Sequence, residues 1–270
     1  MIPRSFHATG KVELSCFRIL LLSGPPGTGK TSLCRALAEK LAIRLGKSVY
    51  YLQVNCQALL SKWFSESGKL VKKLFDDIHI ICKEYPNNLV IVAFDEIESI
   101  LVSRESSFKG TEPSDTIRAV NSMLTEIDAA KELRNLIIMC TSNFPASIDE
   151  AFMSRVDYHH EIRGLNVPAI YKILVDMVQE LGKARIVMDV PTPLPSYQAA
   201  RLEGRQSKLI ELAEVMQEQS MNGRDLRRFP FKVLSHFSMR SVLEVTFAMF
   251  IEASMHLLVS NPSATMIPQR

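Results

Sequence analysis

The sequence lacks several features that would place it in well-known classes of protein. Its most apolar late stretch, 245–259, is interrupted by Glu252 and His256, and no other apolar run approaches the roughly 20 residues of a membrane span. The start carries one basic residue, Arg4, but no apolar segment follows it as in a secretory signal. The sequence therefore predicts neither a membrane protein nor a secreted one.

The sequence also has few cysteines and little net charge. The five cysteines are far apart and form no C-x-x-C pair, which favours a reducing compartment, so we expect a location in the nucleus and cytoplasm. Lys and Arg number 32 against 29 Asp and Glu, and this near balance argues against direct binding to nucleic acid. With 47% apolar residues and only 11 glycines and 13 prolines, the chain can bury a proper core.

Short apolar runs alternate with helix-period stretches through the first part of the chain. This alternation is typical of a parallel sheet with crossover helices. Three of the stretches between the runs each predict a helix with one apolar face, as in the four-residue spacing of Leu33, Leu37, Leu41 and Leu45. We expect five strands, at 19–22, 49–52, 89–94, 136–139 and 158–162.

From Pro168 onward the strand-like runs stop and helical periods take over. The repeat of prolines at 191, 193 and 195 predicts a loop within this part, because proline has no N–H to donate. We therefore expect an α/β nucleotide-binding domain over 1–164 and a smaller, all-helical lid domain over 165–270.

A glycine-rich motif directly follows the first expected strand and opens a helix. It matches G-x-x-x-x-G-K-[ST], in which backbone N–H groups and a helix N-terminus hold phosphate oxygens. Lys30 is expected to reach the β- and γ-phosphates of ATP, and the Thr31 hydroxyl to bind Mg²⁺. The predicted nucleotide-binding residues are Gly24, Pro25, Pro26, Gly27, Thr28, Gly29, Lys30, Thr31 and Ser32.

Polar residues end two further strands at the same expected edge of the sheet. Asp95 and Glu96 end the most apolar strand, where a carboxylate is costly unless it meets a cation or water. We assign Asp95 to Mg²⁺ and Glu96 to activation of the attacking water. Asn143 follows the fourth strand and could hold that water or sense the γ-phosphate; without the other motifs, an Asn after a strand is more often a turn residue.

With these motifs in order, the chain resembles an AAA+ ATPase. Three segments narrow the match to the pachytene checkpoint family, also called the thyroid receptor-interacting protein thirteen family: 61–70 with Trp63 and Phe64, 110–115, and 223–231 with Arg224. The resemblance runs from about residue 19 to residue 258. Such proteins are hexameric remodellers that use ATP to unfold part of HORMA-domain proteins, sometimes with an adaptor, in meiosis and spindle-checkpoint control.

The resemblance implies roles for residues that the motifs alone leave open. Trp63 and Phe64 would form a pore loop that grips the substrate, with 103–112 as a second loop, although both aromatics could instead lie in a core. Asn143 and Arg224 correspond to the two sensors. Arg155 would enter the neighbouring subunit's site, and Arg163 is a weaker candidate for a second such arginine, because Tyr158 occupies the usual position.

The largest departure from the family is at the front of the chain. Only 23 residues precede Gly24, so we expect the family's N-terminal substrate-recognition domain to be missing. This leaves two hypotheses: an active protein remodeller, or a nucleotide-gated oligomerisation module that is catalytically inert or dominant-negative over complete rings. A nucleic-acid loader is a third, less favoured reading because no basic stripe is present.

Overall fold

The fold comes from a computed structural model, which describes residues 18–57, 67–101, 113–202, 208–238 and 244–260. The chain divides into two compact units, and each is described by itself. The first unit comprises Met1–Pro25 and Gly29–Ile162, and the second comprises Pro26–Thr28 and Arg163–Arg270.

The first unit is built on a five-stranded parallel sheet, which confirms the predicted fold class. The strand order is β2-β3-β4-β1-β5, so β1 lies between β4 and β5. Four of the strands extend further toward their carboxyl ends than the apolar runs predicted, because backbone pairing continues past the last apolar side chain. The strands are β1 (Ile19–Ser23), β2 (Val49–Asn55), β3 (Leu89–Asp95), β4 (Leu136–Ser142) and β5 (Tyr158–Glu161).

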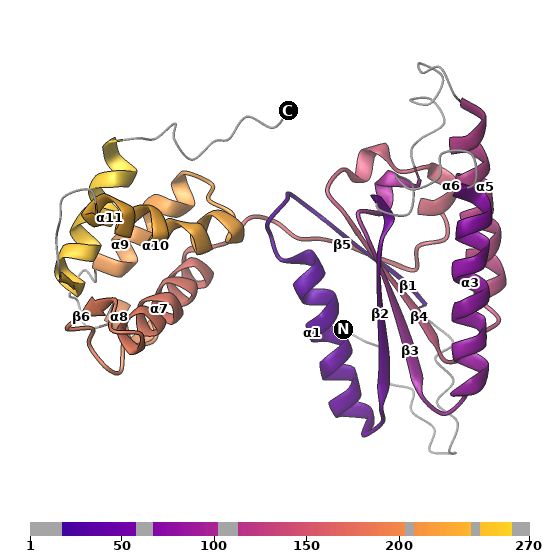
Figure 1. Cartoon of the computed structure of the whole chain (residues 1–270), viewed down its shortest axis with the longest axis horizontal. Helices are drawn as coiled ribbons and strands as arrows, with labels where there is room; N and C mark the ends of the chain where they lie inside the picture. Colours follow the sequence, from indigo (N-terminus) through magenta and orange to yellow (C-terminus); the bar gives the residue numbers. More distant parts are fainter. Residues whose placement is uncertain (1–17, 58–66, 102–112, 203–207, 239–243, 261–270) are drawn as a thin grey trace. The chain divides into compact units, whose positions relative to one another are not determined.

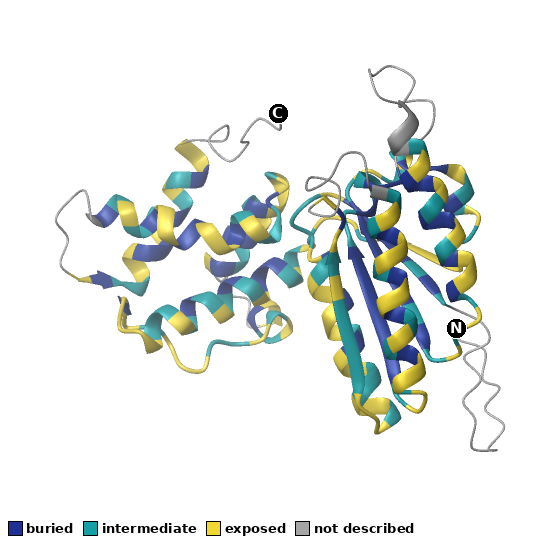
Figure 2. Cartoon of the chain, turned by 45° about the vertical axis from the view of Figure 1, so that its right-hand side comes forward, coloured by how far each residue is buried: buried dark blue, intermediate teal, exposed yellow. Residues whose placement is uncertain are grey.

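Helices cover both faces of this sheet (Figure 1). α1 (Lys30–Leu45) packs on one face, and α3 (Ser67–Glu84) and α5 (Pro113–Ala130) pack on the other. Alternate residues of β3 contribute to the two cores, with Phe94 on the α3 and α5 side and Ile91 on the α1 side. Burial on both faces explains why β3 reads as a continuous apolar run instead of an alternating one (Figure 2).

One detail of the predicted helix packing is wrong. The leucine spacing in α1 predicted that Leu33 would begin the buried face, but Leu33 is exposed and the buried side chains are Cys34 and Ala38. Leu37 and Leu41 pack only at the margin of this core. Small side chains lie at the centre of the contact, which brings the helix close to the sheet.

The remaining elements of the first unit are short and follow the carboxyl ends of β3 and β4. They are the 3₁₀ turns η1 (Ile97–Ser99) and η2 (Pro145–Ser147) and the helix α6 (Glu150–Met153). Asp149 caps the N-terminus of α6, where its carboxylate accepts a hydrogen bond from the Ala151 N–H at 2.9 Å. This cap fixes the chain just before Arg155.

The described part of the second unit is helical, as expected, apart from one pair of short strands. β6 (Val187–Met188) and β7 (Val245–Thr246) pair in parallel, so the prediction of helices alone is wrong at this point. Two residues per strand give no periodic signal that sequence reading could detect. The helices are α7 (Val167–Lys183), α8 (Tyr197–Leu202), α9 (Lys208–Glu218), α10 (Gly223–Ser238) and α11 (Phe247–Ser260), which share one apolar core.

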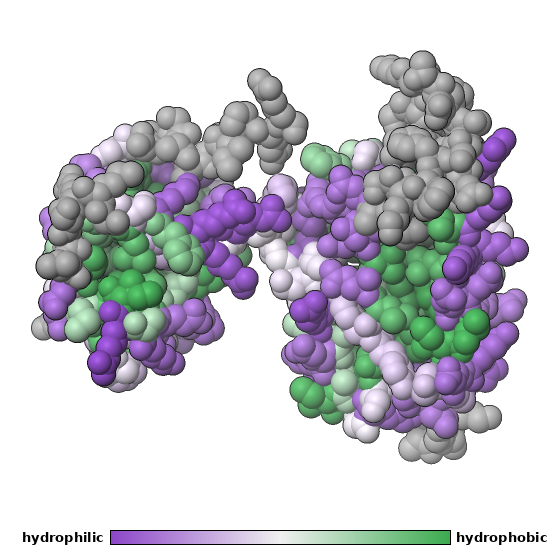
Figure 3. Space-filling view, viewed as in Figure 1, coloured by the Kyte–Doolittle hydropathy of each residue, from purple (hydrophilic) through white to green (hydrophobic). Residues whose placement is uncertain are grey.

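The four cysteines in the described part of the chain are free and buried. Burial raises the pKa of the Cys34 and Cys82 thiols to about 11, so both are protonated at neutral pH and act as small apolar side chains. None of the described helices is long and apolar enough to span a bilayer. The surface view shows hydrophilic side chains over much of both units (Figure 3).

Candidate functional site

The predicted nucleotide site lies at the carboxyl edge of the sheet, where several strands end together. β1 leads into the glycine-rich loop, and the register pairs its last residue, Ser23, with Ser142 at the end of β4. Asp95 ends β3 next to β4. The connection that follows β1 leads to β2 on one side of β1, whereas the connection that follows β4 leads to β5 on its other side. The carboxyl ends of strands at such a change of direction are where open α/β sheets bind ligands.

The loop adopts a conformation that only glycine tolerates easily. Gly24, Gly27 and Gly29 have φ angles of 143°, 77° and 91°. A Cβ atom on Gly24 would lie 2.1 Å from the Ile162 carbonyl oxygen. The glycine spacing of the motif is therefore a steric requirement, and Gly29 is the N-cap of α1, which places the first helical turn and its N–H groups directly after the loop.

Lys30 is the cation of this site. Its side chain is only 6% exposed, and Nζ donates to the carbonyl oxygens of Gly24 at 2.7 Å and Pro25 at 2.8 Å. Burial lowers the pKa of Lys30, whereas the negative charges of Glu98, Asp95 and Glu96 oppose this shift. A bound triphosphate would add negative charge beside the ammonium group and stabilise its protonated form.

Thr31 and Asp95 meet directly, although 64 residues separate them. The Thr31 hydroxyl donates to Asp95 Oδ1 at 2.8 Å, and the Thr141 hydroxyl from β4 donates to the same oxygen. Thr141 Oγ1 also accepts the Glu96 N–H at 3.2 Å. One buried threonine thus fixes both adjacent carboxylate residues relative to the loop.

Glu96 has a strained backbone. Its φ and ψ are 56° and 53°, a left-handed conformation that costs a non-glycine residue about 1–3 kcal/mol. Asn143 Nδ2 donates to Glu96 Oε1 at 3.4 Å, so the two residues predicted to handle the attacking water lie side by side. Strain of this kind is typical of functional sites, because surrounding contacts must hold the residue in place.

Glu98 is a third carboxylate of the site, which the motif search did not single out. Its Oε1 accepts the Asn143 N–H at 2.9 Å. Oε2 is buried, and no described residue donates a hydrogen bond to it. Glu98 is the largest coulombic influence on Lys30 and raises its pKa. Glu98 therefore accepts a hydrogen bond from the predicted sensor, Asn143, and its charge also acts on Lys30 in the loop.

This donor set fits Mg²⁺ with a triphosphate. A hydroxyl and a carboxylate are hard oxygen ligands, and Mg²⁺ in phosphate sites takes one or two such protein ligands besides phosphate and water. Thr31 and Asp95 already lie within hydrogen-bond distance of each other. The left-handed glycines and the buried Lys30 supply the N–H groups and the positive charge that the phosphates need.

The structure gives Arg155 a partner within its own unit. Its Nε lies 3.0 Å and 3.1 Å from the two carboxylate oxygens of Asp128, and its Nη2 lies 2.7 Å from Oδ2. Arg155 is therefore held by an ion pair with another element of its own unit. Arg224 and Arg163 belong to the second unit, and Arg224 lies in the first turn of α10.

Other predicted site residues are placed only in part. Ser32 is exposed on α1. Trp63, Phe64 and the stretch 103–112 lie outside the described residues, so their assignment to pore loops stays a prediction.

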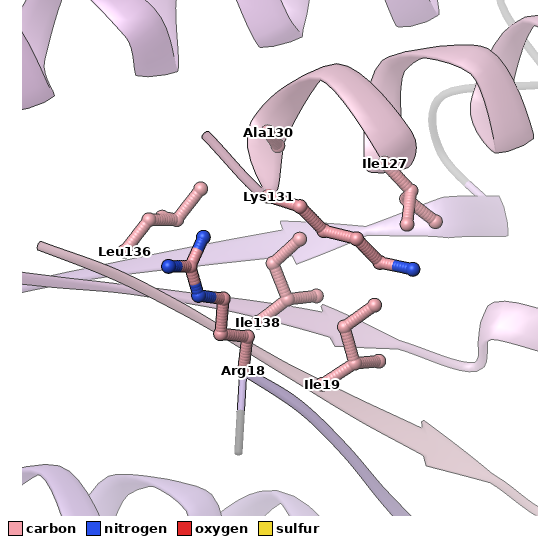
Figure 4. A pocket seen from close by; sticks show the side chains of 7 residues that line it. All are labelled: Arg18, Ile19, Ile127, Ala130, Lys131, Leu136 and Ile138. Carbon is pink, nitrogen blue, oxygen red and sulfur yellow. The ribbon is translucent and has the colours of Figure 1, made fainter. Parts of the chain in front are cut away.

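A small hollow between α5 and the first residues of β1 and β4 lies away from the carboxyl edge, and Arg18 and Lys131 line it together with apolar side chains (Figure 4).

Thr141 offers a test of how the site is held together. Replacing it with valine keeps the shape but removes the hydroxyl, which leaves the Glu96 N–H without its acceptor. We expect Thr141→Val to lower the free energy of unfolding by about 1–3 kcal/mol in urea titration, and to lower ATP turnover as well. Thr141→Ser should restore most of both, and an unchanged stability in Thr141→Val would show that this hydroxyl does not secure the site.

Comparison with known proteins identifies the class. The family model "ATPase family associated with various cellular activities (AAA)" matches residues 20–163, more than half of the chain. The chain belongs to this AAA family. It is similar to the pachytene checkpoint protein 2 homologues of Xenopus tropicalis, 44% identical over 226 residues, and of Homo sapiens, 41% identical over 244 residues. These matches cover 81% and 87% of this chain.

The chain spans about half the length of these relatives, with 52% and 56% of them covered. Among solved structures, C. elegans PCH-2 matches with a TM-score of 0.70 and 33% identity, over 91% of this chain and 62% of that one. A chain of the complex titled E. coli MS115-1 HORMA:CdnC:Trip13 also gives a TM-score of 0.70; with 14% identity over 94% of this chain and 76% of the matched one, it shows the fold alone.

Proposed function

We propose that this chain is an ATP-hydrolysing protein remodeller. The observation that carries the proposal is the meeting of Lys30, Thr31, Asp95, Glu96 and Asn143 at one edge of the sheet. Lys30 and the loop N–H groups bind the phosphates, Thr31 and Asp95 hold Mg²⁺, and Glu96 accepts a proton from the attacking water. Mg²⁺, when bound, neutralises charge that develops on the phosphates.

The substrate and the assembly follow from the resemblance to the pachytene checkpoint family. The substrate class is HORMA-domain proteins, the assembly is a homohexamer, and the places of action are the nucleus and the cytoplasm, in meiosis and checkpoint control. Trp63 and Phe64 grip the substrate in the pore. The helical unit acts as a lid on which Arg224 senses the bound nucleotide.

In this proposal Arg155 completes the neighbouring subunit's site. An arginine supplied from a neighbour makes hydrolysis depend on assembly, because an isolated subunit lacks the positive charge that stabilises the transition state. The second candidate function, an inert oligomerisation module, shares the nucleotide site and the assembly but lacks turnover.

The decisive measurement is ATP turnover per subunit as a function of protein concentration, with size-exclusion chromatography under the same conditions. We expect turnover per subunit to rise steeply as assemblies form, and a purified HORMA-domain protein to change it further. Binding and assembly without turnover would favour the inert module. Turnover that does not vary with concentration would contradict the role of a neighbour's arginine.

A further inference from the structure

Arg155 and Asp128 form a two-point ion pair between separate elements of the first unit. Asp128 lies near the end of α5, and Arg155 lies two residues beyond α6. The carboxylate takes the Nε–Nη2 edge of the guanidinium group, with contacts of 3.0 Å, 3.1 Å and 2.7 Å. Nη1 donates to the Ala151 carbonyl oxygen at 2.5 Å. All three guanidinium nitrogens are therefore oriented by this chain.

The stability of the fold does not explain this geometry. The side chains of Asp128 and Arg155 are 46% and 26% exposed, and ion pairs with that much contact with water contribute little to folding. A two-point contact between a guanidinium and a carboxylate does, however, define direction more sharply than a single contact does. The ion pair therefore affects the orientation of the Arg155 guanidinium more than it affects the stability of the fold.

Both partners are anchored firmly enough to orient one another. α5 is held in the core by Met123 and Ile127, which are fully buried. α6 is held by buried Phe152 and capped by Asp149. The hydrogen bond with Asp128 raises the pKa of Arg155, and the same bond lowers the pKa of Asp128, so the pair stays ionised near neutral pH. Lys131 is the other cation facing Asp128, at 3.5 Å.

We infer that Asp128 is a positioning residue that orients Arg155 for the neighbouring subunit's triphosphate. The carboxylate of Asp128 bonds to the Nε–Nη2 edge of the guanidinium and leaves the terminal Nη1–Nη2 edge. Among the described residues, the one further acceptor for that edge is the Ala151 carbonyl oxygen, which bonds to Nη1. A terminal edge is suited to two phosphate oxygens at once. The inference rests on the proposed function, in which Arg155 acts on the adjacent site.

A mixed assembly tests Asp128 separately from Arg155. Lys30→Ala subunits cannot hold nucleotide but offer Arg155, whereas Arg155→Ala subunits hold nucleotide but offer no arginine. Each variant alone should be inactive, and the mixture should regain turnover where an Arg155→Ala site adjoins a Lys30→Ala neighbour. Asp128→Asn is then added to one kind of subunit at a time, and ATP turnover is measured at saturating nucleotide.

We expect Asp128→Asn to reduce the turnover of the mixture about 10- to 100-fold when it is placed on the Lys30→Ala subunit, because a small misplacement of a reacting group has effects of this size. On the Arg155→Ala subunit it should change turnover less than about 2-fold, since no Arg155 is left there to orient. KM for ATP should not change. Lys131→Ala on the Lys30→Ala subunit is the matched control and should leave turnover unchanged.

The outcomes separate this inference from the proposed function. A mixture that regains no turnover would overturn the role of Arg155 in the neighbouring site, and the role of Asp128 with it. Two results would overturn only the positioning role of Asp128. In the first, the mixture regains turnover and Asp128→Asn does not change it. In the second, Asp128→Asn lowers turnover equally whichever subunit carries it. Higher turnover with Asp128→Asn would overturn it too, because Asp128 would then be withholding Arg155 from the phosphates.

Discussion

Glu96→Gln should leave ATP binding intact and lower turnover by about 10²–10⁴-fold, the usual contribution of a general base. Glutamine keeps the size of the side chain and one oxygen that can accept from Asn143 Nδ2, but it cannot take a proton from water. ATP affinity measured by calorimetry with Mg²⁺ should match that of the unchanged chain, while phosphate release in a steady-state assay should almost cease.

Two variants make the Glu96 result interpretable. Lys30→Ala should abolish binding and turnover together, because the buried cation of the loop is lost. Glu132→Gln changes an exposed carboxylate beyond the end of α5 and should alter neither quantity. Comparable turnover in Glu96→Gln and the unchanged chain would remove Glu96 from the reaction. The buried carboxylate of Glu98 would then be the next residue to test as the base.

Arg155→Ala should lower turnover by about 10³–10⁵-fold while ATP binding and assembly persist, since arginines that reach a neighbouring site contribute this much to phosphoryl transfer. The measurement is ATP turnover at a concentration where size-exclusion chromatography shows the assembled form. Loss of the exposed ion pair with Asp128 should change the melting temperature only slightly.

Arg163→Ala is the informative comparison for Arg155. Arg163 is exposed, and the sequence left it as a weaker candidate for a second arginine acting on the neighbouring site. A small effect at Arg163 with a large effect at Arg155 would assign the role to Arg155 alone. Full activity in Arg155→Ala would show that hydrolysis needs no arginine at this position, and the expected dependence on protein concentration would lose its physical basis.

The sequence predicts the parts of this protein whose signals are local. The glycine-rich loop, its lysine and its threonine occupy one continuous stretch, and the φ angles of Gly24, Gly27 and Gly29 explain why those positions must be glycine. The apolar runs predicted the five parallel strands, and the helical periods predicted most helices. Such signals survive in sequence because each depends on side chains only a few positions apart.

Residues that act across long separations were missed or seen only in part. Thr141 was assigned no role from the sequence, yet it contacts Asp95 and Glu96 from a neighbouring strand. Glu98 and Asp128 belong to no sequence motif. Their roles could have been predicted only by knowing which strands and helices are neighbours in the fold. The face of α1 was misjudged for a related reason: burial depends on what packs against the helix, and leucine spacing does not report that.

The amino-acid sequence by itself determined that the chain has a phosphate-binding loop and a carboxylate pair after a buried strand. It also determined the fold class, which presents both at one edge of the sheet. The tertiary structure decided which residues meet: Asp95 with Thr31 and Thr141, Asn143 with Glu96 and Glu98, and Arg155 with Asp128. The reason is physical. Backbone pairing and core packing bring distant segments together, and hydrogen bonds of about 3 Å form only once those segments are fixed.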